Sequence, residues 1–154
     1  RPDRIIVGEV RGSEALELIQ AMNTGHKGCM GTVHANAALE SLTRLQALAQ
    51  GGEAKISETA LVMQIASAVD LVVQVSRYSD GSRRVHSITE VLGLDEKGHY
   101  QVQDVFTMSR LVKQPDGKLK GGLLPNNMPT FMDEIEDNGL PISRGLFTKK
   151  KKAA

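Results

Sequence analysis

The sequence predicts an α/β fold, in which parallel strands with flanking helices are followed by an antiparallel β-meander. In the first half, short apolar runs alternate with segments of helical periodicity, a pattern typical of a parallel sheet covered by helices. After residue 77 the helical segments stop, and strand-like runs separated by tight turns indicate antiparallel pairing. A length of 154 residues with 40% hydrophobic content suffices for a real core.

The chain opens with a strand, a turn and a helix. Residues 5–7 form a continuous apolar run, the pattern of a parallel strand that is covered on both faces. Ser13 is placed to cap the following helix, which Gly25 ends. The apolar face of this helix repeats at helical spacing and comprises Ala15, Leu18, Ile19 and Met22.

The same unit then repeats. Residues 29–35 are expected to form a second strand, and Asn36 to cap a second helix that residues 51–52, two glycines, bring to an end. Ser57 is expected to cap a third helix. This helix leads into residues 70–76, which we expect to be a third strand of the parallel sheet.

The second half contains the meander and a short C-terminal helix. Residues 85–94 and 99–108 are expected strands, each preceded by a turn. Residues 112–128 show no period and are interpreted as a loop. Thr130 is expected to cap a short helix over 131–139, and the end of the chain through Lys152 is expected to be mobile.

Composition excludes several classes of protein. The net charge of +1 is dispersed except for Lys149 to Lys152, and there are five aromatic residues, so a nucleic-acid-binding role is disfavoured. The single cysteine, Cys29, is interpreted as a small buried strand residue. A metal site at His26 and His34 is not expected, because no cluster completes a four-ligand set.

Polar residues follow the first two expected strands. Glu9 follows the first strand, and Thr32 and His34 lie at the end of the second. Ligands of open parallel sheets collect at these strand ends, so a carboxylate and an imidazole there could hold Mg²⁺ or a water and contact a phosphate oxygen. Spacing alone is equally compatible with Glu9 as an exposed carboxylate near a helix N-terminus. For His34 it favours an ordinary loop residue over a functional one.

The segment RPDRIIVGEVRGSEALELIQAMNTGHKGCMGTVHAN, residues 1–36, resembles the Walker B segment and His box of the type II/IV secretion ATPases. Within this family, the sequence of the segment most resembles that of the tight-adherence (Tad) pilus branch. The resemblance covers about the first 110 residues and includes SAVDLVVQ (67–74) and DGSRRV (80–85). Residues 128–147 resemble the tail of that branch.

The resemblance implies roles for individual residues. Glu9 would be the Walker B glutamate that polarises the attacking water and assists Mg²⁺ coordination indirectly, and His34 would lie near the γ-phosphate. Nucleotide-binding or interface roles are implied, with less support, for Gly8, Arg11, Thr32 and Asn36.

Several alternatives remain open for this set of residues. Arg11 is equally compatible with a salt bridge to a nearby acid. Gly8 would allow close approach of the backbone, and three further glycines would let the His-box loop turn: Gly25, Gly28 and Gly31. Arg83 and Arg84 match a hairpin signature but are interpreted as a solvated face.

The phosphate-binding loop of P-loop ATPases, G-x-x-x-x-G-K-[ST], is absent from the sequence. In the family this Walker A motif precedes the Walker B strand. We therefore expect the chain to be the C-terminal half of a RecA-like motor domain. Half of a γ-phosphate pocket cannot supply the stabilisation that phosphoryl transfer needs, so the chain alone is expected to be inactive.

The resemblance also implies cofactors and partners for the longer parent protein. These are ATP, Mg²⁺, a homo-hexameric ring and an inner-membrane secretion or pilus platform protein, with a cytoplasmic location at the membrane through partners and no nucleic acid. We expect residues 1–111 to belong to the motor domain and 112–154 to form a loop, helix and tail. The alternative is a non-enzymatic interaction module in which residues 78–154 dock a platform partner.

Overall fold

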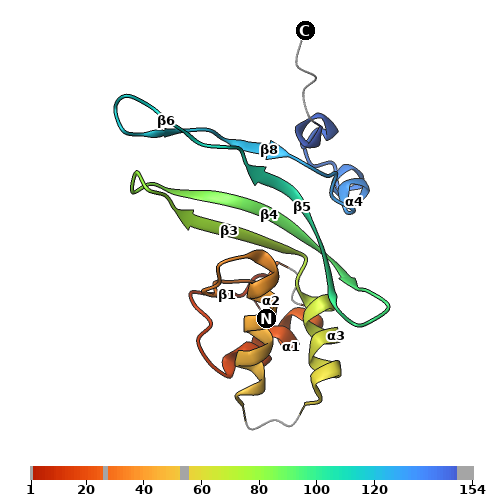
Figure 1. Cartoon of the computed structure of the whole chain (residues 1–154). Coiled ribbons are helices and arrows are strands. Elements are labelled where there is room, and N and C mark those ends of the chain that lie inside the picture. Colours follow the sequence, from red (N-terminus) through yellow and green to blue (C-terminus); the bar gives the residue numbers. More distant parts are fainter. Residues whose placement is uncertain (1, 26–27, 53–55, 149–154) are drawn as a thin grey trace. The chain divides into compact units, whose positions relative to one another are not determined.

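The computed structural model describes residues 2–25, 28–52 and 56–148, which form a mixed α/β fold (Figure 1). The chain divides into two compact units. The first unit comprises Arg1–Val72 with Val91–Val102, and the second comprises Val73–Glu90 with Gln103–Ala154. The expected division into 1–111 and 112–154 stays a prediction.

Two short parallel strands lie in the first unit. Strand β1 (Ile6–Val7) pairs with β2 (Met30–Gly31), with Ile6 opposite Met30 and Val7 opposite Gly31. Both strands are shorter than expected. Ile6 is 69% exposed and Met30 54%, so the expectation that both faces of β1 are covered is wrong.

Three helices form the hydrophobic core of the first unit (Figure 1). They are α1 (Glu14–Asn23), α2 (Ala38–Gln50) and α3 (Glu58–Ala68), as the apolar periodicity predicts. Each helix turns its apolar stripe toward the others, and this burial out of water is what holds them together. The most deeply buried large side chains of this core are Ile19, Leu42, Leu61 and Ile65.

The predicted helix caps are only partly confirmed. The Ser57 hydroxyl accepts a hydrogen bond of 3.2 Å from the amide of Ala60, which caps α3. Ser13 occupies the N-cap position of α1, but its side chain makes no capping bond. The expectation for Asn36 is wrong, because Ala37 is the N-cap residue of α2.

The meander is confirmed by three consecutive strands, β3 (Leu71–Arg77), β4 (Arg83–Leu94) and β5 (Tyr100–Met108). Together with β8 (Leu123–Pro125) they form a four-stranded sheet in the order β3-β4-β5-β8. The expectation that the strand at 70–76 joins the parallel sheet is therefore wrong. The turn after β3 is too short for a crossover helix, so the chain can only return as a hairpin, and the amide of Tyr78 donates to the carbonyl of Ser82 at 2.9 Å.

The expected loop over 112–128 contains ordered strands. Strands β6 (Val112–Lys113) and β7 (Leu119–Lys120) pair in an antiparallel hairpin, and β8 then pairs with β5. Gly117 adopts a φ of 83° in the turn of this hairpin, a conformation that favours glycine. Strands of two or three residues are too short to show the alternation on which sequence prediction relies.

The C-terminal segment contains two short helical elements before residue 148, and its expected mobility stays a prediction. Helix α4 (Met132–Asp137) begins after Phe131, so Thr130 is not its cap. A 3₁₀ helix follows (Arg144–Phe147), and Arg144 binds both Asp133 and Glu136. The prediction for Lys149 to Lys152 lies outside the described residues.

A buried carboxylate lies between β4 and the residues before α4. Glu90 is 2% exposed. It accepts a 2.7 Å hydrogen bond from the side-chain amide of Gln103 and further hydrogen bonds from the amide and hydroxyl of Thr130. These donors satisfy the carboxylate, and burial without them would cost several kcal/mol. They explain why a charged residue can occupy the interior of the second unit.

Candidate functional site

The ends of β1 and β2 bring Glu9 and His34 together. A hydrogen bond of 2.8 Å from the amide of Val10 to the carbonyl of Thr32 continues the pairing beyond the two strands. This hydrogen bond keeps the two segments in the register of the parallel pair, and His34 Nε2 lies 3.1 Å from Glu9 Oε1. A carboxylate and an imidazole that are 25 positions apart in the sequence therefore share one edge of the parallel pair.

Arg11 binds the second oxygen of the Glu9 carboxylate. Its Nη2 atom lies 2.5 Å from Glu9 Oε2. The guanidinium and the imidazole are largely exposed, at 77% and 87%, whereas the Glu9 side chain is 26% exposed. The hydrogen bond from Arg11, together with the positive charge of its guanidinium, lowers the pKa of Glu9 below its ordinary value, and partial burial opposes this shift.

Glu14 orders the turn that follows Glu9 and was not singled out in the sequence. Its Oε1 atom accepts hydrogen bonds from the amides of Arg11, at 2.7 Å, and Gly12, at 3.1 Å. These bonds lower the pKa of Glu14. A glutamate in the first turn of a helix was the available signal, because a carboxylate is stabilised at the positive end of the helix dipole. The two amides precede α1, so Glu14 fixes the turn before the helix and does not replace the cap that was expected of Ser13.

Thr32 and three of the glycines have structural roles. The Thr32 hydroxyl donates to the carbonyl of Gly8 and ties the ends of the two strands together. Gly25 and Gly28 adopt φ angles of 90° and 81°, which supports the expected turning of this loop. Gly31 does not turn the chain. It lies in β2, where a Cβ atom would meet Leu18 Cδ2 at 3.1 Å.

The positions of Gly8, Asn36 and Cys29 give no direct support to the roles predicted for them. A Cβ atom at Gly8 would meet nothing within 4 Å, so close approach of a ligand backbone or phosphate there stays a prediction. Only the amide of Asn36 is engaged, donating to Glu40 Oε2 at 3.3 Å. Cys29 is half-buried and precedes β2 rather than lying in a strand, and His26 lies outside the described residues.

The two hairpin arginines differ from each other. Arg83 is exposed, as expected. The expectation is wrong for Arg84, whose side chain is 25% exposed and lies 3.0 Å from Asp80. Arg84 also donates to the carbonyl of Leu119 at 2.7 Å. It joins the turn after β3 to β7 and is therefore a structural residue.

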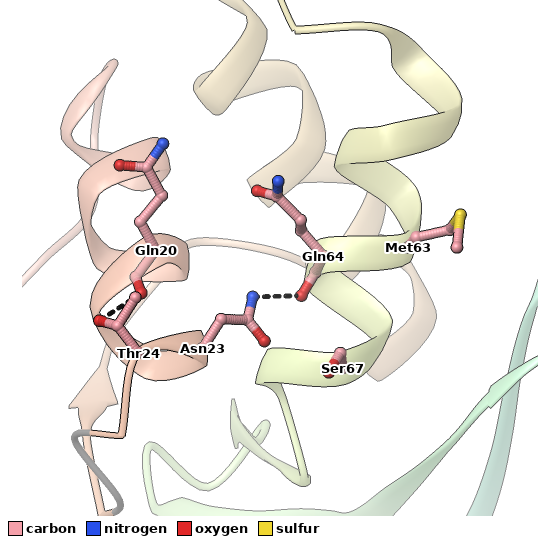
Figure 2. Close-up of a pocket in the computed structure, with 6 residues that line it drawn as sticks. All are labelled: Gln20, Asn23, Thr24, Met63, Gln64 and Ser67. Atoms are coloured by element: carbon pink, nitrogen blue, oxygen red, sulfur yellow. Dashed lines mark hydrogen bonds between the residues drawn. The ribbon is translucent and has the colours of Figure 1, made fainter.

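A cavity of about 310 Å³ lies between the end of α1 and α3 (Figure 2). Asn23 donates from its side-chain amide to the carbonyl of Gln64 at 2.9 Å across this cavity. No lining residue is charged, so the cavity does not suit a phosphate, and none of the predicted site residues lines it. The lining residues are Gln20, Asn23, Thr24, Met63, Gln64 and Ser67.

The described residues contain neither a candidate metal cluster nor a candidate membrane-spanning helix. Over 2–25, 28–52 and 56–148, no group of three or more His, Cys, Asp or Glu side chains is placed to hold a metal ion. In the same part of the chain, no helix has the length and apolarity needed to cross a membrane.

The geometry supports contact with a water or an anion at this edge. Glu9 is held ionised by a cation and can accept a proton or a hydrogen bond, while His34 and Arg11 present donors on either side of it. A single carboxylate fits Mg²⁺ through bridging water, because Mg²⁺ keeps several waters and takes its remaining ligands from phosphates. The sequence holds no Walker A motif, the loop whose backbone amides cradle the phosphates in P-loop ATPases.

The chain resembles known secretion proteins over most of its length. A family model described as "Type II/IV secretion system protein" matches residues 1–114. The conjugal transfer protein TrbB of Rhizobium radiobacter is 45% identical over 103 residues, which are 67% of this chain and 30% of that protein. Protein VirB11 of Agrobacterium fabrum is 32% identical over 84 residues, which are 52% of this chain and 24% of that protein.

A solved structure supports the same relationship at the level of the fold. The crystal structure of the VirB11 ATPase from the Brucella suis type IV secretion system, in complex with sulphate, matches with a TM-score of 0.53 and 26% identity. The match covers 57% of this chain and 27% of that one. The match spans 30% of the length of TrbB and 24% of the length of VirB11.

Proposed function

The chain belongs to the type II/IV secretion system protein family, and on this premise we propose that it forms part of the nucleotide site of a secretion ATPase. The observation that carries the proposal is the 3.1 Å contact between Glu9 and His34 at the ends of adjacent parallel strands. Phosphoryl-transfer sites need a group that orients the attacking water and a donor near the γ-phosphate. The pair supplies one of each.

In this proposal Glu9 is the Walker B glutamate and His34 the His-box histidine. When bound, the nucleotide and its Mg²⁺ supply the γ-phosphoryl group and the positive charge that stabilises it. The Glu9 carboxylate accepts a hydrogen bond from the attacking water and reaches the metal only through water. Arg11 keeps Glu9 ionised and oriented through its hydrogen bond to Oε2. His34 donates toward the phosphate, and Thr32, Gly8 and Asn36 are proposed to shape the surrounding surface.

The remainder of the site is proposed to come from other parts of a longer protein. No Walker A motif is present, so the chain alone is proposed neither to bind ATP tightly nor to hydrolyse it. The exposed apolar pair Ile6 and Met30, opposite each other on the parallel strands, supports packing of further residues there.

For the longer protein we propose a RecA-like core in a homo-hexameric ring. It would power secretion or Tad-type pilus assembly from the cytoplasmic side of an inner-membrane platform. The relatives named above include the conjugal transfer protein TrbB, so conjugation is a second process that the parent could serve. Docking of a platform partner by residues 78–154, without catalysis, stays the alternative.

The proposal is tested by measuring phosphate release with two proteins, this chain and a secretion ATPase that contains it. We expect no turnover from the chain alone. In the longer protein we expect Glu9→Gln to lower kcat by about 10²- to 10⁴-fold, the range for loss of a group that assists proton transfer. Glu17→Gln is the matched control, because Glu17 is an exposed carboxylate on α1, and kcat should stay at the wild-type level.

Two results would contradict the proposal. One is wild-type turnover by the Glu9→Gln variant of the longer protein. The other is turnover by the isolated chain that Glu9→Gln abolishes, which would mean that the chain is a complete enzyme. Turnover by the isolated chain that survives Glu9→Gln would instead come from a contaminating ATPase.

A further inference from the structure

One asparagine of the chain is followed by a glycine. Asn138 precedes Gly139, whereas the other asparagines of the sequence precede larger residues. Both residues of the pair are exposed at the end of α4. Glycine has no Cβ atom, so its backbone nitrogen can approach the side-chain carbonyl of the residue before it. The pair therefore combines the two residue types that favour loss of the asparagine amide group.

The reaction at such a pair is an intramolecular substitution. The backbone nitrogen of Gly139 attacks Cγ of Asn138, the bond between Cγ and Nδ2 breaks, and ammonia leaves with the proton of the Gly139 amide. Water then opens the cyclic imide at one of its two carbonyls, which gives aspartate or its β-linked isomer. The only co-reactant is water, and the nucleophile is held next to its target by the chain itself.

In the folded chain both nitrogens of this reaction are engaged. The Asn138 side-chain amide donates to the carbonyl of Glu134 at 2.7 Å, and the Gly139 amide donates to the carbonyl of Glu136 at 2.9 Å. The reaction therefore waits until the last turn of α4 opens. A helix as short as α4 is marginal by itself, so contacts from outside the helix must hold this turn closed.

Arg144 supplies such contacts from the 3₁₀ helix. Its guanidinium binds the Glu136 carboxylate through two hydrogen bonds, of 2.7 and 2.9 Å, and also binds Asp133. These two acids lie near the two ends of α4, so a single arginine ties both ends together. The Arg144 side chain is 48% exposed, and exposed ion pairs of this kind are weak. The turn is therefore restrained but can still open.

Two aspartates are also followed by glycine, and their surroundings are less favourable for the same reaction. The Asp80 side chain is 6% exposed and accepts hydrogen bonds from the Ser82 hydroxyl and the Leu119 amide. Asp116 is exposed, but a carboxylate is attacked less readily than an amide because it carries negative charge. Asn138 is thus the position at which exposure and chemistry coincide.

We propose that Asn138 is a site of spontaneous deamidation, and that the ion pairs of Arg144 control its rate. The product carries a new negative charge at the C-terminal end of α4, where the helix dipole disfavours it, and it lacks the donor to Glu134. The modification therefore loosens the end of α4 as the protein ages. The inference is independent of the proposed ATP hydrolysis, because these residues lie outside the Glu9 site and beyond the family match at 1–114.

The first test is incubation of the chain at neutral pH, followed by digestion at low pH and mass spectrometry of the peptides. We expect the heavier carboxylate product at Asn138 before it forms at any other asparagine. Arg144→Gln should accelerate the reaction at Asn138 about 2- to 5-fold, because loss of exposed ion pairs raises the population of the open turn by that factor. The comparison positions are Asn23, Asn36, Asn126 and Asn127.

The matched control is Arg83→Gln. It removes the same charge from an exposed position of the second unit and should leave the rate at Asn138 unchanged. Thermal unfolding of each variant verifies that it is folded. The proposal is overturned if another asparagine reacts before Asn138, or if Arg144→Gln reacts at the wild-type rate. It is also overturned if Arg83→Gln accelerates the reaction as much as Arg144→Gln, because the effect would then come from net charge.

The second test concerns the consequence of the modification. Asn138→Asp reproduces one product, and hydrogen exchange compares it with wild type after correction for the neighbouring side chain. The amides of Gly139 and Leu140 donate hydrogen bonds at the end of α4, and both should exchange faster in the variant. The amide of Gln114, bonded within the β6–β7 hairpin, should exchange at the same rate in both proteins. Unchanged exchange at Gly139 and Leu140 would show that the new charge does not loosen α4.

Discussion

Two glycines near the candidate site have opposite surroundings. Gly31 lies against the core, where an added Cβ atom would meet Leu18 Cδ2 at 3.1 Å, and Gly8 is in open space. Leu18 is 7% exposed and cannot move into solvent, so Gly31→Ala should lower the free energy of unfolding by about 1–3 kcal/mol. Urea denaturation of this chain is the measurement.

Gly8→Ala is the matched variant for that experiment. It should change the free energy of unfolding by less than about 0.5 kcal/mol, because the added methyl group contacts nothing. Equal losses of stability from both substitutions would show that Leu18 does not restrict the space at Gly31. A stable Gly8→Ala variant would also be the correct reagent for asking, in a longer secretion ATPase, whether Gly8 admits a phosphate.

Single residues of the site could be predicted only where a sequence pattern, such as an apolar run that marks a strand, fixed their position. Glu9 and His34 follow apolar runs, so their meeting at one sheet edge was predictable from strand ends. Glu14 and Arg84 act through contacts that the sequence does not signal strongly, one with backbone amides and one with a carbonyl 35 positions away. Such contacts depend on how turns close, which local composition does not determine.

At the scale of elements, the N-termini of α1 and α3 invite a direct comparison. The Ser57 hydroxyl caps α3, whereas the Ser13 side chain makes no cap bond to α1. Ser57→Ala should therefore lower the free energy of unfolding by about 1 kcal/mol. Ser13→Ala should leave it within about 0.5 kcal/mol of wild type, measured by urea denaturation. An equal effect at both positions would mean that a serine at the N-cap stabilises these helices without its hydroxyl bond.

The elements themselves were predictable in proportion to their length. The three long helices and the strands β3, β4 and β5 have enough residues for a clear period or a clear apolar run. The hairpin β6–β7 and strand β8 have two or three residues each and were expected to be loop. The partner of β3 was also missed, because apolar runs of parallel and antiparallel strands look alike when both faces are partly buried.

For the molecule as a whole, Asp80 links stability to pH. Hydrogen bonds from the Ser82 hydroxyl first, and then from the Leu119 amide, hold the pKa of Asp80 well below its usual range. A lowered pKa means that the ionised carboxylate stabilises the fold above the unfolded-chain value of about 3.9, and that this contribution is lost as the pH falls below it. We expect wild type to be more stable than Asp80→Asn by a constant margin between about pH 5 and 7, and by a shrinking margin below about pH 4.

Urea denaturation across this pH range measures the margin, and Asp3→Asn controls for the loss of one negative charge at an exposed position. A margin that stays constant down to about pH 2 would show that the Asp80 carboxylate contributes through its shape and not through its charge.

The buried carboxylate of Glu90 has a consequence for how the protein folds during its synthesis. Its donor Thr130 lies 40 positions later in the chain. When Glu90 leaves the ribosome, the amide and hydroxyl that will cover it have not yet been synthesised, and its charge must stay hydrated. Loops of this length close slowly compared with local hairpins. The interior of the second unit can therefore form completely only after Thr130, 40 positions beyond Glu90, has been synthesised. In a nascent chain that stalls before Thr130, Glu90 lacks the hydrogen bonds from that residue.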